Sequence, residues 1–117
     1  MKEARFVGTA RKDLAAFPES ARRRAGYELF MVQVGREPAD FKPLPAVGPG
    51  AYEIRVRDEA GAFRVIYVAK FEYAVYVLHA FQKKTRKTAK ADIELAARRY
   101  KLIGEDHEES EDADHTG

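Results

Sequence analysis

The 117 residues of the chain suit one domain with a single modest core, and the formal net charge is only +2. Because there is no cysteine, disulfides and thiolate metal sites are excluded, and no apolar run approaches the roughly 20 residues of a membrane helix. The N-terminus lacks an apolar stretch of signal-peptide length, so we expect a cytoplasmic location by default.

The first third of the chain predicts a short strand and two helices. Residues 5–7 are a candidate strand, and Thr9 is suited to cap a helix that ends near Phe17. Pro18 can open a second helix, which Gly35 can end. Within it, apolar residues recur at helical spacing, at Ala21, Ala25, Leu29 and Val32. We expect the two helices to form a hairpin.

The middle of the chain predicts a loop and three strands. Residues 36–50 contain four of the five prolines, so they can form neither a helix nor a central strand. Three β-rich runs follow, at Tyr52–Arg57, Phe63–Phe71 and Ala74–Phe81, separated by turns at residues 58–61 and 72–73. The first run alternates strictly, with Ile54 and Val56 on one face. The charged residues of that run therefore lie on the other face.

The end of the chain predicts one helix and an acidic tail. Thr88 can cap the helix, whose apolar stripe consists of Ile93, Ala97 and Tyr100. Residues 105–117 hold seven of the 19 acids and one apolar residue, so we expect a disordered tail after a domain of residues 1–104. That domain carries all 21 Lys and Arg and only 12 acids, a formal excess of nine positive charges. Such a body favours a polyanionic partner, and a solvated basic surface is the alternative.

The predicted element order is β-α-α-β-β-β-α. Helices that bury their apolar stripes against an antiparallel sheet form a two-layer sandwich of the α+β class. We expect all helices to pack on one face of the sheet. The opposite face would then be open to a ligand.

Cations on strands are the most informative feature of the sequence. Arg55, Arg57 and Arg64 occupy the first two strand runs between apolar neighbours, although Arg is not a favoured strand residue. If the apolar face meets the helices, these side chains are exposed on the open face, where they suit a phosphate backbone. Solvation of an outer sheet face is the alternative.

A second basic group follows the third strand directly. The run 82–88, QKKTRKT, contains Lys83, Lys84, Arg86 and Lys87 just before a predicted helix N-terminus. Cations next to helix amides form a local anion site. Short basic runs are common, so the prediction depends on this run lying at the end of the sheet that displays Arg55.

His79 is the one histidine inside the predicted domain, and it is a candidate acid or base. Strand alternation places it with Val75, Val77 and Phe81, which favours a structural histidine at a strand edge. The two further histidines lie in the acidic tail, where nothing fixes a coordination geometry. We therefore expect neither a metal nor a cofactor.

Several of these segments resemble one known family. The runs YEIRVRDEAGAFRVIYVAKF and VLHAFQKKTRKT, with DFKPLP and AFPESARRRAGYELF before them, are similar to phage-derived, HigB-like toxins of the RelE/ParE superfamily. The resemblance covers about residues 5–103. It implies a RelE-like fold and a metal-independent endoribonuclease that cuts messenger RNA on the ribosome. It also implies a helix-turn-helix antitoxin as partner, in a toxin–antitoxin hetero-oligomer.

The resemblance also implies roles for individual residues. By motif position the catalytic cations correspond to Arg55, Arg64, Lys83 and Lys84, and the RNA-binding cations to Arg57, Arg86 and Lys87. RelE-type enzymes also use a tyrosine near the C-terminus. Tyr100 fits the apolar stripe of the final helix instead, so the general base stays open between Lys83, Lys84 and His79.

Two other functions remain open at this stage. A ParE-like toxin that poisons DNA gyrase by binding it has the same fold and no nuclease activity. An inactive nucleic-acid-binding module would also carry a basic face. The FQKKTRKT run and the Arg55/Arg64 pair favour the nuclease.

Overall fold

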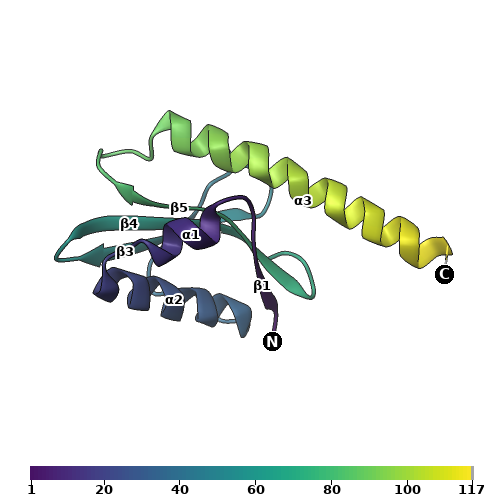
Figure 1. Cartoon of the computed structure of the whole chain (residues 1–117), viewed down its shortest axis with the longest axis horizontal. Helices are drawn as coiled ribbons and strands as arrows, with labels where there is room; N and C mark the ends of the chain where they lie inside the picture. Colours follow the sequence, from purple (N-terminus) through teal and green to yellow (C-terminus); the bar gives the residue numbers. More distant parts are fainter. Residues whose placement is uncertain (117) are drawn as a thin grey trace.

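The computed structural model describes residues 1–116, with the side chains of residues 1–104. In this part of the chain a five-stranded sheet lies between helices (Figure 1). The strands are β1 (Glu3–Phe6), β2 (Phe41–Pro43), β3 (Ala51–Asp58), β4 (Gly61–Val68) and β5 (Ala74–Lys83). The helices are α1 (Ala10–Ala15), α2 (Glu19–Gln33) and α3 (Lys90–Thr116).

The sheet has the order β1-β5-β4-β3-β2, and the predicted α+β class is confirmed. Two details differ from the prediction. β1 pairs with β5 in parallel, which the long intervening chain allows, while the other pairs are antiparallel. β2 forms inside the proline-rich loop, at the edge of the sheet. An edge strand is hydrogen-bonded on one side only, so Pro43, which has no amide hydrogen to donate, is tolerated there.

The first face of the sheet packs against α1 and α2. Leu14 and Phe17 from the α1 segment join the predicted stripe of α2 in one buried cluster. The strands contribute Ile54, Val56, Phe63, Val65, Val75 and Val77 to the same cluster. The apolar residues of β3 therefore face these helices, as the alternation in the sequence predicts.

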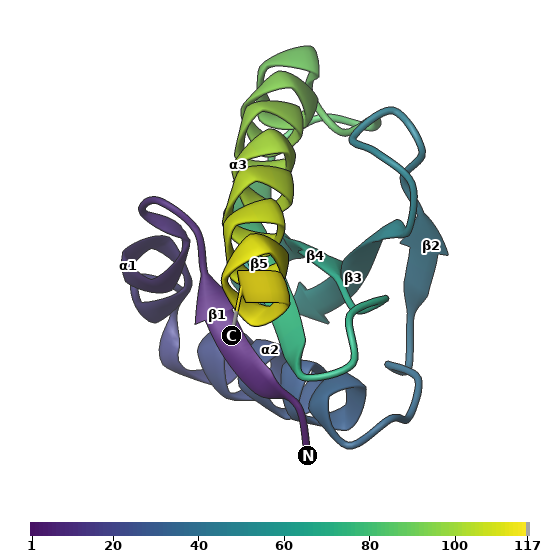
Figure 2. The ribbon, with the colours of Figure 1, turned by 90° about the vertical axis from the view of Figure 1, so that its right-hand side faces the viewer.

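The second face is partly covered by α3, so the prediction that all helices lie on one face is wrong. Ala96 and Ile103 of α3 are buried in a second cluster, which includes Ile66, Val68, Ala74, Tyr76 and Leu78 from the strands. Figure 2 shows α3 above β5, with α2 on the other side of the sheet. The physical reason is β5, whose alternate residues are apolar on both faces and need a cover on each.

Glycine ends α2 as predicted. The amide of Gly35, whose φ is 84°, donates to the Val32 carbonyl at 3.1 Å, and the amide of Arg36 donates to the Met31 carbonyl at 2.8 Å. This pair of bonds is a Schellman motif, and its left-handed residue favours glycine.

Thr9 occupies the N-cap position of α1 as predicted, although its side chain does not cap the helix, and the predicted cap at Thr88 is wrong. The Thr9 hydroxyl donates to Asp13 Oδ2 at 2.7 Å and forms no bond to the backbone of α1. The Thr88 hydroxyl donates to Glu53 at 2.7 Å, and α3 begins only at Lys90. The backbone of α3 continues through Thr116, across most of the segment predicted to be a disordered acidic tail, residues 105–117, and the side chains of that segment lie outside those described.

Two glycines of the α2 segment predict opposite effects on stability. Gly35→Ala should lower the free energy of unfolding by about 1 kcal/mol, because it forces a Cβ into the left-handed region. Gly26→Ala should raise it by about 0.5–1 kcal/mol, because Gly26 lies inside α2 and a Cβ there meets nothing within 4 Å. Urea denaturation measures both, and effects of the same sign would contradict this account.

Candidate nucleic-acid interface

The part of the second sheet face that lies beyond the α3 cluster is lined with cations. Arg55 pairs across the strands with Arg64, and Lys83 pairs with Ala62, two residues before Arg64, so strand alternation places all three on one face. Lys42 of β2 pairs with Glu53 on the same face. We call Lys42, Arg55, Arg64 and Lys83 the cationic face.

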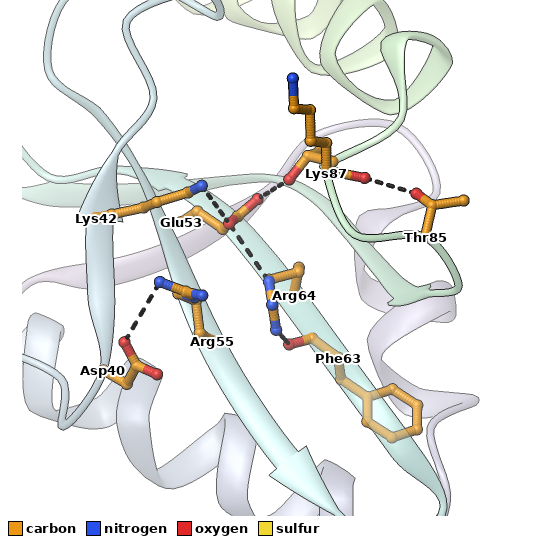
Figure 3. Close-up of polar contacts among 9 residues, drawn as sticks. Asp40, Lys42, Glu53, Arg55, Phe63, Arg64, Thr85 and Lys87 are labelled. Atoms are coloured by element: carbon orange, nitrogen blue, oxygen red, sulfur yellow. Dashed lines mark hydrogen bonds and ion pairs between the residues drawn. The ribbon is translucent and has the colours of Figure 1, made fainter.

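A buried carboxylate lies at the centre of the cationic face. Glu53 is 0% exposed, and its Oε1 lies 3.3 Å from Arg64 Nε and 4.0 Å from Lys42 Nζ. Its other oxygen accepts the Thr88 hydroxyl at 2.7 Å. Figure 3 shows Lys42, Arg64 and the loop between β5 and α3 converging on this carboxylate.

Arg64 is buried, so its predicted exposure on an open face is wrong. Its side chain is 4% exposed, and Nη1 donates to the Phe63 carbonyl at 3.0 Å. Nε faces Glu53 without hydrogen-bond alignment, and Nη2 makes no hydrogen bond to a described residue. Burial, and to a smaller extent Arg55, lowers the pKa of Arg64, although Glu53 raises it.

Lys83 ends β5 beside this pair and is partly exposed. Burial lowers the pKa of its ammonium group, and the neighbouring charge of Arg64 lowers it further. A lysine with a lowered pKa has a larger fraction of free amine near neutral pH. It is therefore suited to accept a proton from a hydroxyl group.

Arg55 and Arg57 remain accessible at the outer part of β3. The Arg55 side chain is 35% exposed, and its Nη1 lies 4.0 Å from Asp40 Oδ1. Arg57 is exposed, and it lines a shallow groove with Ser20, Arg24 and Tyr27 along α2. The structure thus brings Arg55 close to Arg64 and leaves Arg57 nearer the edge of the sheet.

The loop at residues 84–89 carries the remaining predicted cations. Lys84, Arg86 and Lys87 are exposed, and the Thr85 hydroxyl donates to the Lys87 carbonyl at 2.6 Å. Thr88 connects this loop to Glu53 in the sheet. The loop therefore continues the basic surface from the end of β5.

His79 contacts α3. It is 6% exposed, its Nε2 lies 2.7 Å from Asp92 Oδ1 of α3, and its ring stacks on Phe81 at 4.6 Å. Its predicted grouping with Val77 on one face of the strand is wrong. The pairing of β5 with β4 shifts in register between Ile66 and Tyr67, so the alternation of β5 is broken between Val77 and His79. The Asp92 contact supports the structural role over the catalytic one.

Two classes of site are absent from the described part of the chain. Its side chains include no group of three or more His, Asp or Glu that could hold a metal ion. None of the helices searched there is long and apolar enough to cross a membrane.

Sequence reasoning did not identify three members of the site: Glu53, Lys42 and Thr88. Glu53 carries the clearest signal, since it shares the strand face of Arg55 and an acid inside an apolar strand needs a partner. Lys42 lies in the proline-rich segment that we expected to be a loop. Thr88 has the sequence position of a helix cap, which hides its contact with the sheet.

Comparisons with known proteins agree with this fold. The model of a family described as phage derived protein Gp49-like matches residues 12–101, while no curated protein gives a significant match. A double arginine-to-alanine mutant of the E. coli toxin RelE, in the free state, matches with a TM-score of 0.60 at 19% identity, covering 87% of this chain and 97% of that chain. The toxin–antitoxin complex RelBE2 from Mycobacterium tuberculosis matches with a TM-score of 0.49 at 27% identity, covering 70% and 91%.

The buried ion pair predicts a large loss of stability for Arg64→Ala. Removing the guanidinium leaves Glu53 buried without its nearest cation, which typically costs about 3–5 kcal/mol. Arg55→Ala is the matched control. The contact of Arg55 with Asp40 is long and exposed, so it should contribute less than about 1 kcal/mol to the free energy of unfolding. Urea denaturation measures both variants, and equal stabilities would contradict the structural role of Arg64.

Proposed function

We propose a function for this chain from the premise that it belongs to the phage-derived Gp49-like family. That membership and the fold shared with RelE confirm the superfamily expected from the strand and FQKKTRKT motifs. We infer that the protein is the toxin of a type II toxin–antitoxin system. In this proposal it is a cytoplasmic, metal-independent endoribonuclease that cuts messenger RNA on the ribosome.

One observation carries the proposal. Cations from four strands converge where α3 leaves the sheet uncovered, and the exposed loop at residues 84–89 adds three more beside them. A phosphate backbone is the natural ligand of such a surface, because each contact releases counterions. Arg55, whose side chain is 35% exposed, and the neighbouring Arg64 are arranged to bind non-bridging phosphate oxygens.

The proposed reaction uses the RNA itself as nucleophile. The 2′-oxygen attacks the adjacent phosphorus, the bond to the 5′-oxygen breaks, and the products carry a 2′,3′-cyclic phosphate and a 5′-hydroxyl. Lys83 as a free amine accepts the 2′-OH proton, and Lys84 as an ammonium donates a proton to the leaving 5′-oxygen. Arg55 and Arg64 stabilise the charge that develops on the phosphate.

The remaining predicted residues have simpler roles in this proposal. Arg57, Arg86 and Lys87 bind phosphates on either side of the scissile bond, since all three are exposed around the cationic face. His79 has no step, because it contacts Asp92 beneath α3.

A helix-turn-helix antitoxin is the proposed protein partner, and α2 offers a surface for it. Tyr27, Phe30 and Val34 are 58%, 42% and 39% exposed and recur along the helix and its C-cap, which makes an apolar stripe. Arg23 and Arg24 lie one turn before this stripe, with side chains 77% and 61% exposed. An amphipathic antitoxin segment with acidic residues would match both features.

The nuclease proposal predicts that Lys83→Arg abolishes cleavage but preserves RNA affinity. Arginine keeps the positive charge and cannot act as a base at accessible pH, so the rate should fall by about 10²- to 10⁴-fold. The wild-type rate should rise with pH through the lowered pKa of Lys83, because only the free amine accepts the proton. Mapping of cleaved message ends with translating ribosomes gives the rate, and anisotropy gives the affinity.

The matched control is Lys12→Arg, which changes an exposed lysine of α1 on the other side of the sheet. It should cleave like the wild type. Growth arrest without cleaved message would overturn the nuclease. A supercoiling assay would then test whether the chain poisons gyrase.

The antitoxin proposal predicts an association rate that falls with salt and with charge reversal on α2. Electrostatic steering by a basic body accelerates encounter with an acidic segment and is screened by ions. Arg23→Glu combined with Arg24→Glu should slow association at low salt. Arg98→Glu, an exposed change on α3, should have little effect. Stopped-flow rates that are insensitive to salt and to both changes would count against this docking surface.

A further inference from the structure

We propose that Glu53 is a positioning residue of the cationic face, whose buried carboxylate aims Arg64 and anchors the loop at residues 84–89. This inference rests on the proposed function, which assigns no role to any acid. It concerns a residue that touches neither RNA nor the reacting atoms. Its effect would pass through the groups that do.

The burial of Glu53 is the first observation. A fully buried carboxylate is costly unless cations and hydrogen-bond donors compensate it, and here Arg64, Lys42 and Thr88 do so. Replacing a buried ion pair by apolar residues is often neutral or stabilising, so the pair is weak evidence of a contribution to stability. The neighbouring strand residues Ile66 and Val68 show that this face accommodates apolar side chains. A charged pair at this position therefore calls for a reason other than packing.

The two oxygens of Glu53 serve different elements. Oε1 contacts cations of β2 and β4, while Oε2 accepts the hydroxyl of Thr88 from the loop. One carboxylate thus connects the sheet to the segment that carries Lys84, Arg86 and Lys87. Without this connection the loop would lose the contact that ties it to the sheet beneath it.

The carboxylate also restricts the direction of Arg64. Glu53 faces Nε, and the Phe63 carbonyl accepts a bond from Nη1. Nη2 makes no hydrogen bond to a described residue. The ion pair at Nε and the hydrogen bond at Nη1 restrict the direction of the guanidinium, which lowers the entropy lost when it binds a phosphate.

The charge of Glu53 acts on Lys83 as well. Lys83 is affected by Arg64 on β4, Lys42 on β2, and Arg55 and Glu53 on β3. The three cations lower the pKa of Lys83, and Glu53 is the group that opposes them. Loss of the negative charge should therefore lower the pKa of Lys83 further, and a solely structural role of Glu53 would not produce that shift.

Glu53→Gln tests this inference with a side chain of the same shape. The amide oxygen can still accept the Thr88 hydroxyl, so the variant removes the charge and keeps the loop contact. We expect cleavage at least about tenfold slower and a pH profile whose rise moves to lower pH. Thr88→Val removes the loop contact alone, so it should weaken RNA binding and leave the pH profile unmoved. Glu94→Gln, at an exposed acid of α3, is the control and should change neither.

Readouts other than cleavage separate this inference from the proposed function. Titration of the Lys83 amino group by NMR and RNA affinity are measurable whether or not the chain cuts RNA. A lower Lys83 pKa and weaker RNA binding in Glu53→Gln would support the inference, and wild-type values of both would overturn it. An inactive wild type would overturn the nuclease alone. If Glu53→Gln does not fold, Thr88→Val tests the loop contact of Glu53 by itself, and wild-type RNA affinity in that variant would overturn the anchoring of the loop.

Discussion

The contact between Glu53 and Arg64 lies where the covered and the open parts of one sheet face meet. On one side of it, Ile66, Leu78 and the rest of the second cluster pack beneath α3. On the other side, Arg55 and Lys83 reach solvent. The carboxylate of Glu53 lies within ion-pair distance of both Lys42 and Arg64, and its negative charge offsets the repulsion between these two cations. The shape and charge of the proposed site both follow from this arrangement.

The contact also explains how a small sheet carries an apolar core and a charged surface on the same face. β5 is apolar on both sides along most of its length, with His79 buried within it, and it ends in the polar residues Gln82 and Lys83. α3 begins after a loop and covers the apolar stretch of β5, so the polar end stays accessible. In the proposed function, RNA binds at this uncovered end.

Much of the fold follows from local pattern. The strict alternation of β3 predicts both the buried Ile54 and the outward Arg55, and the helical spacing of Ala21 to Val32 predicts the buried stripe of α2. These predictions succeed because each depends only on the spacing of apolar residues within one strand or one helix. The strand positions of Arg55 and Arg64, and hence their adjacency, follow from the hairpin turn between them.

The misplaced residues are those whose environment depends on elements distant in the sequence. Arg64 is buried beside Glu53, which also accepts the hydroxyl of Thr88, and the pattern of its own strand reveals neither contact. His79 turns toward α3 because a register shift breaks the alternation. The apolar stripe of α3 could pack on either face of the sheet. β5 has apolar residues on both of its faces, and the second of these faces is the one that α3 covers.

The salt dependence of RNA affinity tests the central claim, that the cationic face binds a phosphate backbone, most directly. For single-stranded RNA the slope of log affinity against log salt changes by about 0.7 for each phosphate contact. The account predicts that Arg55→Ala reduces the slope by about that amount, while Lys12→Ala leaves it unchanged. Identical slopes for the wild type and Arg55→Ala, at equal affinity, would contradict the claim.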